Sequence, residues 1–270
     1  MPLKNLIVHL DQGARTRARL DLATAIARHH QARLVGLFGQ RAHPQQVGIV
    51  ASWPPEDYVA AAAASKRLFE AATAGMPRAE WADVNRGGDT ALLDRITELA
   101  RYCDLIVLGQ HDPRDAAQVP AELAEHVLVN SGRPALIVPY AGNHAAVFKR
   151  PLIAWNDSRE AAHALNDALP LIAGCEEAIV VSLDTRHEQA TAACAAVAAH
   201  LACHGIPTST DILPVGDVGI MDTLLNRLVD KGADLLVMGA HGHTANPFVS
   251  RGSGTQHILN SMTVPVLMAS

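Results

Sequence analysis

The sequence predicts two tandem α/β domains, each built on a doubly wound parallel sheet. Three observations support this fold class. Short, continuous apolar runs alternate with longer segments that have helical spacing, which is the pattern of parallel strands covered on both faces. The pattern occurs twice along the 270 residues, once in each half. Each half closes with a proline followed by another apolar run, which we interpret as a final strand.

The repeat sets the register between the two halves. The first two pairs of matching runs lie 145 residues apart, whereas a later pair lies 130 residues apart. The drop of 15 residues indicates an insertion in the first half, which we place at the Pro-rich loop before a helical run over 56–74. The matching runs are 6–11 with 151–156, 34–38 with 179–183, 104–111 with 234–241, and 133–138 with 264–268, the last aligned on Pro134 and Pro265.

The remaining helical segments fall between these runs, and they complete two domains at 1–143 and 148–270. The short join, Tyr140-Ala141-Gly142-Asn143-His144, has a small and polar centre, so we expect the two sheets to lie close together. The predicted helices are 18–29, 90–101, 159–172, 190–204 and 221–231.

Composition excludes several classes of function. There are 22 Lys and Arg against 27 Asp and Glu, a net charge of −5, so nothing in the overall charge attracts nucleic acid or anionic lipid. Aromatic residues make up 4%, too few for a surface that stacks bases. We find no signal peptide and no apolar run long enough to span a membrane, so we expect a soluble, cytoplasmic protein.

The cysteines do not suggest a metal or disulfide framework. Cys103, Cys175, Cys194 and Cys203 show no CxxC spacing and no histidine-rich partner pattern. We therefore expect buried thiols in a reducing compartment.

One loop in the second half has the composition of an anion-binding site. It follows the predicted strand over 235–238, and four glycines fall within residues 239–254. Ser253 to Thr255 then begin a predicted helix. Glycines allow close approach of the backbone, and a helix start offers unpaired N–H groups with partial positive charge. The spacing is neither GxxxxGK[ST] nor GxGxxG, so P-loop and dinucleotide-binding folds are set aside.

The spacing of these glycines does match a known signature. Gly239-x-x-Gly242, nine residues and Gly252-Ser253 resemble the nucleotide-binding motif of the universal stress protein family. Both halves also share that family's order of strands and helices and its domain size. The resemblance implies the adenine nucleotide alpha-hydrolase-like fold for each half, with ATP, with or without Mg²⁺, bound by the second.

The resemblance also implies which residues hold the nucleotide. Asn156 departs from the family pattern, which has an Asp in Asp-x-Ser, and a neutral Asn loses a charge-assisted bond to a hydroxyl. Asp157 could substitute for that acid, or it could cap the helix that follows. By resemblance, the phosphate contacts are Gly239, Gly242, Gly252, Ser253 and Gly254, Met238 lies near the ribose and base, and Ala154, Asn156 and Leu183 are candidates for adenine and ribose contacts.

Other interpretations of the same loop stay open. The glycines could do no more than shape a long loop, which explains Gly239 better than it explains the glycines beside Ser253. His241 and His243 invite a metal site, but no nearby carboxylate or thiol cluster completes one. Arg251 could pair with a terminal phosphate or lie in solvent.

The first half lacks most of the phosphate-binding pattern. Asp112 stands where the second half has Gly242, and Ala121 or Glu122 stands in the place of Gly252. An acid at that position removes a permissive backbone and repels an anion, so we expect no phosphate binding there. Asp11 does keep the family's acid at the end of the first strand.

Three functions follow from these observations. We favour a stress-response regulatory protein that binds ATP or a related adenine nucleotide in its C-terminal domain and responds through an unidentified protein partner. The alternatives are a nucleotide-independent stress protein that acts through protein contacts, and a slow ATP hydrolase, although no general base or magnesium carboxylate is recognisable. Members of the family dimerise through their last strands, so 134–139 and 265–268 should meet in an intramolecular pseudo-dimer, with a further homodimer left open.

Overall fold

The computed structural model describes residues 2–42, 45–47, 50–52, 54–85, 87–115, 118–183, 187–213, 219–240 and 253–270. Two compact units make up the chain, Leu3–Arg133 and Pro134–Ser270. The predicted boundary between 143 and 148 stays a prediction. By compactness the units divide at Pro134, because the strand that closes the first half pairs with the last strand of the second.

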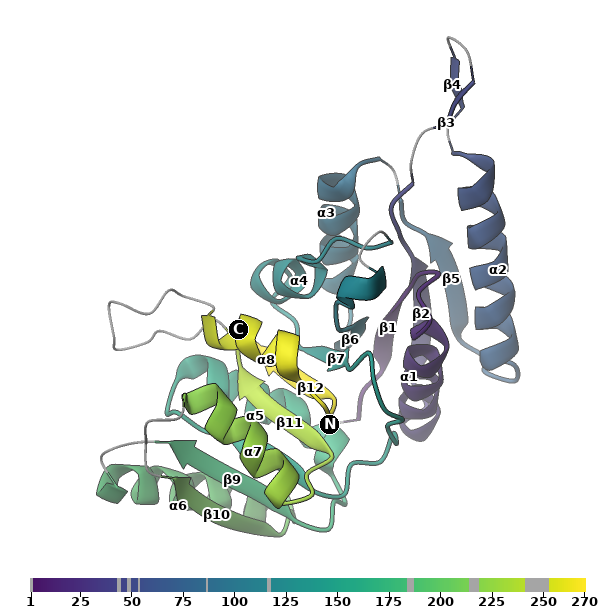
Figure 1. Ribbon diagram of the computed structural model, residues 1–270. Helices are drawn as coiled ribbons and strands as arrows, with labels where there is room; N and C mark the ends of the chain where they lie inside the picture. The colour runs from purple at the N-terminus through teal and green to yellow at the C-terminus, as the bar shows by residue number, and fades with distance from the viewer. Residues whose placement is uncertain are drawn as a thin grey trace. The chain divides into compact units, whose positions relative to one another are not determined.

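The N-terminal unit is a parallel sheet with helices on both faces (Figure 1). Its strands lie in the order β6-β1-β2-β5, and all three pairings are parallel. Helix α1 packs on β1 and α2 on β2, whereas α3 and α4 pack against each other. In chain order the elements are β1 (Asn5–Leu10), α1 (Thr16–His30), β2 (Arg33–Phe38), β3 (Gln45–Val47), β4 (Val50–Ser52), α2 (Glu56–Ala72), β5 (Ala79–Asp83), α3 (Asp89–Ala100), β6 (Leu105–Gly109), a 3₁₀ turn (Pro113–Asp115) and α4 (Leu123–Ser131).

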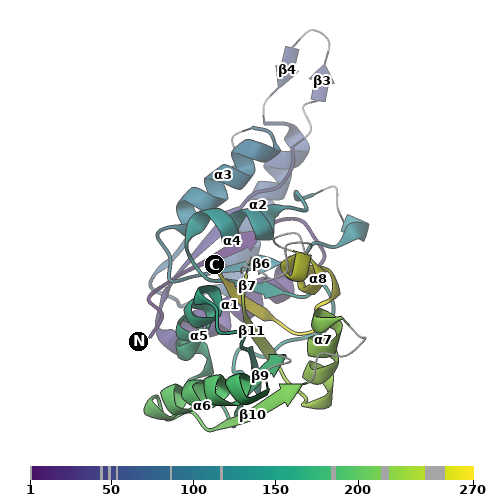
Figure 2. The ribbon, with the colours of Figure 1, turned by 90° about the vertical axis from the view of Figure 1, so that its left-hand side faces the viewer.

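The C-terminal unit repeats this arrangement and adds one antiparallel strand. Its strands lie in the order β10-β9-β8-β11-β12-β7, with only the β12–β7 pairing antiparallel. Figure 2 shows α5 and α6 on one side of the sheet and α7 and α8 on the other. The elements are β7 (Ala135–Val138), β8 (Pro151–Ala154), α5 (Arg159–Ile172), β9 (Ala178–Leu183), α6 (His187–Cys203), β10 (Thr208–Leu213), α7 (Ile220–Asp230), β11 (Leu235–Gly239), α8 (Ser253–Ser261) and β12 (Val266–Ala269).

The central strands are apolar between their ends because both of their faces are covered. In β1, Leu6, Val8 and Leu10 are each fully buried, and so are Leu235 and Leu236 of β11. Burying each such side chain contributes roughly 1.5–3 kcal/mol. Polar groups are consequently confined to the strand ends, where the chain leaves the sheet.

The predicted fold class is confirmed, and the predicted helices agree with the structure to within a few residues. The insertion also lies where the repeat placed it, because residues 39–55 separate β2 from α2 whereas only 184–186 separate β9 from α6. The loop prediction for this stretch was incomplete, since β3 and β4 pair there as a small antiparallel hairpin. Valines at 47 and 50, paired across this hairpin, favour extended backbone.

The last strands of the two halves meet as predicted. β7 pairs with β12 in antiparallel register, with Ile137 opposite Val266 and Leu136 opposite Leu267. The pseudo-dimer as an arrangement of whole domains stays a prediction. The expectation of buried thiols holds for Cys103, Cys175 and Cys194, but Cys203 at the end of α6 is exposed.

Candidate nucleotide site

The carboxyl ends of β8, β9 and β11 meet at one edge of the C-terminal unit. β8 lies between the other two, with Ala154 opposite Met238 on one side and Val181 on the other. From β8 the chain first builds outward through β9 and β10 and then crosses back to β11, so the strand order reverses between β8 and β11. Such a switch point is where open parallel sheets bind ligands. The structure therefore brings Ala154, Leu183, Met238 and Gly239 to one edge, with Asn156 just beyond it.

Gly239 is required by a close approach of two backbones. A Cβ atom at this position would lie 2.7 Å from the backbone nitrogen of Ala161 and 2.7 Å from the carbonyl carbon of Glu160. No L side chain fits at that distance without a shift of the backbone. Packing alone thus accounts for this glycine, as the structural interpretation of the loop expected.

Asn156 takes part in the start of helix α5. Its side-chain oxygen accepts a hydrogen bond from the Ser158 hydroxyl at 2.7 Å, and the Ser158 oxygen accepts the backbone N–H of Ala161 at 3.1 Å. The idea that Asp157 caps this helix was wrong, because Ser158 is the N-cap. Asp157 instead has a left-handed backbone, with φ at 58°, a conformation that Asp tolerates better than most residues. Asn156 itself is exposed.

The N-terminus of α5 already carries a negative charge. Glu160 lies in its first turn and is 7% exposed. Its own backbone N–H bonds to the carboxylate and lowers its pKa, which burial opposes and Arg159 reinforces at 3.1 Å. This carboxylate already complements the partial positive charge of the helix end, and it would repel a polyphosphate bound there.

The start of α8 is the second helix N-terminus at this edge. α8 begins at Ser253 as predicted and leads back to β12, the neighbour of β11, so its N-terminus lies on the carboxyl side of the sheet. Gly254 lies against α7, since a Cβ there would be 3.1 Å from the Met221 methyl carbon. His257 also joins α8 to α7 through Asp222, at 2.8 Å.

Part of the predicted loop lies outside the described residues. Of Leu183 and Ser253 the structure describes the backbone alone. The predicted phosphate contacts Gly242 and Gly252 fall outside it, together with His241, His243 and Arg251. Within the described ranges, no group of three or more His, Cys, Asp or Glu residues could hold a metal ion.

Trp155 is a polar group at this edge that sequence reasoning missed. It follows β8 directly and donates its backbone N–H to Val181 O at 2.8 Å. Its indole nitrogen is buried, and among the described residues it has no hydrogen-bond partner. An aromatic residue directly before Asn156 was the signal in the sequence.

The first half differs from the second at the matching positions. Asp112 does stand after β6, but its carboxylate is paired rather than free to repel an anion. Arg114 donates to it from Nε at 2.9 Å and from Nη2 at 2.8 Å, and these bonds lower the pKa of Asp112. Asp11, at the end of β1, accepts the Gly13 N–H at 2.8 Å and the Thr16 hydroxyl, and it pairs with Arg19 at 2.8 Å.

Comparisons with known proteins find one family model and several solved structures that are similar to this chain. The model described as the Universal stress protein family matches residues 160–270. Among solved structures, a universal stress protein from Archaeoglobus fulgidus DSM 4304 is 18% identical with a TM-score of 0.71, and the match covers 98% of this chain and 96% of that one. A structure from Pseudomonas aeruginosa UCBPP-PA14, described as a universal stress protein, is 16% identical with a TM-score of 0.57, covering 99% and 93%.

These similarities confirm the fold across the whole chain. No match was found among curated proteins. No helix within the described residues is both long and apolar enough to cross a membrane.

Replacing Gly239 tests the close approach of β11 to α5. We expect Gly239→Ala to lower the free energy of unfolding by about 1–3 kcal/mol, because the added methyl group must displace backbone. Urea denaturation followed by circular dichroism measures the change. Gly87→Ala is the control, because a Cβ there would meet Ala91 Cβ at an ordinary 3.7 Å. Equal stability of the two variants would show that the approach is not tight.

The contacts of Asp11 predict how the stability of the fold changes at acid pH. Burial alone would raise its pKa, but Arg19, His9 and two hydrogen bonds lower it from 3.8 to about 2. A lowered carboxyl pKa stabilises the fold above the unfolded-state value, and the contribution, about 2 kcal/mol, is lost as the pH falls from about 4 to 2. We therefore expect Asp11→Asn to unfold more easily at pH 7 and the gap from wild type to narrow over that range.

Thermal unfolding of wild type and Asp11→Asn from pH 7 to pH 2 measures this gap. The control is Asp21→Asn, which removes an exposed acid paired with Arg17 on the same helix. A gap of constant size down to pH 2, or an equal loss in the control, would contradict the assignment.

Proposed function

We propose that the C-terminal half of the chain, in which residues 160–270 match the universal stress protein family model, binds ATP or a related adenine nucleotide, and that the chain is a stress-response regulator. The observation that carries the proposal is the convergence of three strand ends at the β8–β11 switch point, with the start of α8 on the same side of the sheet. That edge combines three strand ends with the partial positive charge of a helix N-terminus.

The N-termini of α5 and α8 at this edge differ in charge, and this difference decides where the phosphates bind. The start of α5 carries the buried Glu160 carboxylate, which repels a polyphosphate. No acidic residue stands in the first turn of α8, and this helix end carries partial positive charge. The phosphates therefore bind at α8, with Gly254 and the preceding loop glycines around them. Mg²⁺ would accompany ATP as its counter-ion.

The base and ribose bind at the ends of the strands. Ala154 is a small, half-buried residue, and Asn156 presents an exposed amide that bonds a ribose hydroxyl or a base edge. Met238 ends a buried stretch of β11 beside Ala154. Trp155, whose buried indole N–H has no partner among the described residues, adds a fluorescent side chain to the same strand end.

Binding of this kind regulates without catalysis. A ligand shifts a conformational equilibrium by as much as its affinity differs between the two states. Nucleotide held between β8, β11 and α8 would favour one state of a surface that a protein partner binds.

A nucleotide-independent protein is the second candidate, and Asn156 is the observation that favours it. The amide supplies hydrogen bonds of ordinary strength where a carboxylate would supply charge-assisted ones. In that case the edge would serve the fold alone and the chain would act through protein contacts.

Thermal unfolding with nucleotide tests the proposal. Ligand at about 100 times its dissociation constant stabilises the native state by about 2.7 kcal/mol, so millimolar MgATP should raise Tm by several degrees. Gly252→Glu should abolish the shift, because a carboxylate beside the phosphates repels them. The control is Gly88→Glu, an exposed position where a Cβ meets nothing within 4 Å.

Three outcomes separate the candidates. A shift in wild type and in Gly88→Glu, absent from Gly252→Glu, supports the proposal. An unchanged Tm in all three proteins supports the nucleotide-independent function. Phosphate release by wild type above that of Gly252→Glu would instead indicate a hydrolase.

Asn156→Asp tests the position at which this chain has Asn in place of the Asp of the family pattern. A carboxylate makes the bond to a ribose hydroxyl charge-assisted, so we expect nucleotide to bind about 5- to 10-fold more tightly. Calorimetric titration with MgATP measures the dissociation constant. Asp157→Asn, a substitution of the neighbouring exposed acid, should leave it unchanged. Weaker binding by Asn156→Asp would remove this residue from the site.

A further inference from the structure

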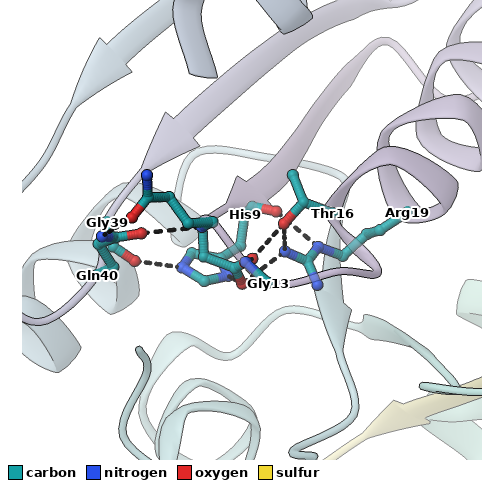
Figure 3. Close-up of polar contacts among 8 residues, drawn as sticks. His9, Gly13, Thr16, Arg19, Gly39 and Gln40 are labelled. Atoms are coloured by element: carbon teal, nitrogen blue, oxygen red, sulfur yellow. Dashed lines mark hydrogen bonds and ion pairs between the residues drawn. The ribbon is translucent and has the colours of Figure 1, made fainter. Parts of the chain in front are cut away.

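The N-terminal unit has the same switch point, but polar side chains of its own fill it. Here the strand order reverses between β1 and β6, so the carboxyl ends of these strands correspond to those of β8 and β11. Figure 3 shows Arg19, from helix α1, reaching toward His9 at the end of β1 and toward Thr16. The side chain of Arg19 is 5% exposed.

The guanidinium of Arg19 is held by three different groups. Nε donates to the backbone carbonyl of His9 at 2.7 Å, and Nη2 donates to Asp11 Oδ2 at 2.8 Å and to Thr16 Oγ1 at 3.1 Å. A carboxylate, a carbonyl and a hydroxyl arranged around a planar cation form a specific receptor for guanidinium.

Arg19 also reaches the neighbouring strand. A Cβ built on Gly109, the last residue of β6, would overlap its Nη1 atom. The guanidinium thus lies across the ends of β1 and β6, where Gly109 corresponds to Gly239. In the C-terminal unit it is the backbone of α5 that approaches the glycine.

The other polar groups of this edge bond to one another. Gln40 Nε2 donates to Gln12 Oε1 at 3.1 Å, and the Gln12 N–H donates to Gln40 Oε1 at 2.9 Å. Asn85 donates to the Gln40 carbonyl at 2.5 Å. Burial lowers the pKa of His9 to about 4, so its ring is neutral at pH 7 and bonds Gly39 O through Nε2 at 2.7 Å.

The second half has none of these side chains at the matching positions. At the offset of 145 residues, Arg19 corresponds to Ala164 and His9 to Ala154. Ala164 is fully buried and Ala154 half-buried, and neither can supply a cation. The second half therefore lacks both the arginine and its acid, since Asp11 corresponds to Asn156.

We propose that Arg19 is a built-in occupant of the N-terminal switch point, so that this half holds its own guanidinium where the C-terminal half takes a nucleotide. The comparison with the second half rests on the proposed function, whereas the guanidinium receptor stands on the contacts of Arg19. The chain consequently binds one nucleotide and not two.

Chemical rescue tests the receptor directly. Arg19→Ala should lower Tm, and N-ethylguanidinium, the fragment that this change removes, should bind in its place. At about ten times its dissociation constant it should raise the Tm of Arg19→Ala by roughly 2–4 °C over the same concentration of NaCl. The same compound should not raise the Tm of wild type or of Arg17→Ala, which lacks an exposed arginine on the same helix.

If N-ethylguanidinium does not raise the Tm of Arg19→Ala, the proposal is overturned. If Arg19→Ala does not fold, Arg19→Lys carries the same test, because lysine keeps the charge but lacks the planar fork, and its Tm should fall below that of Arg17→Lys. Equal Tm values for these two lysine variants would also overturn it.

Nucleotide stoichiometry separates this inference from the proposed function. Calorimetric titration of the full chain with MgATP should give one site. Two sites would overturn the inference and leave the proposed function standing. No binding would overturn the proposed function, and the rescue experiment then decides the inference by itself.

Discussion

The burial of parallel strands on both faces is the constraint on which this molecule depends. A strand such as β1 or β11 has helices above and below it, so the side chains of its middle residues must be apolar. Charged and hydrogen-bonding groups are then restricted to the strand ends. Chemistry in either unit is confined to one edge, and the reversal of strand order decides where along that edge it lies.

The two halves use this edge in opposite ways. In the first, a carboxylate and a guanidinium face each other across the switch point, and the surrounding amides partner one another. A buried pair of this kind adds little net stability, but it is costly to break on one side only. In the second half both charges are gone, and the first turn of α5 closes on Gly239.

Loss of the pair as a unit is physically reasonable. An arginine left without Asp11 would be a buried, uncompensated charge, and an aspartate left without Arg19 would lose the cation that most strongly lowers its pKa. The two positions are therefore expected to change together during divergence of the halves. Removing both frees the edge for a ligand that brings its own charge.

Much of the fold could be predicted from the sequence, because apolar runs and helical spacing report burial directly. The offset between repeats located the insertion at 39–55, and the final prolines located the strands β7 and β12. The loop that begins at Gly239 was located from a strand end and the spacing of its glycines, whereas Ala154 and Met238 came from the resemblance to the universal stress protein family. These features depend on the spacing of apolar runs, repeats and prolines, which a single sequence shows.

The remaining features depend on which hydrogen-bond or ion-pair partner each polar side chain has in the folded chain. Four arginines, at 15, 17, 19 and 28, occur around α1, and charge alone does not show that one of them turns inward. Its spacing from Ala23 and Ile26 did place Arg19 on the buried face, which was the available signal. Ser158 and Asp157 are both good caps, so only backbone geometry separates them.

A crystal structure of the chain grown with ATP and Mg²⁺ would show which edge binds nucleotide. We expect a single nucleotide at the carboxyl ends of β8 and β11, its phosphates at the first turn of α8, with Arg19 still bonded to Asp11 in the other unit. Nucleotide at the ends of β1 and β6 with Arg19 displaced, or phosphates bound at the start of α5 beside Glu160, would contradict it.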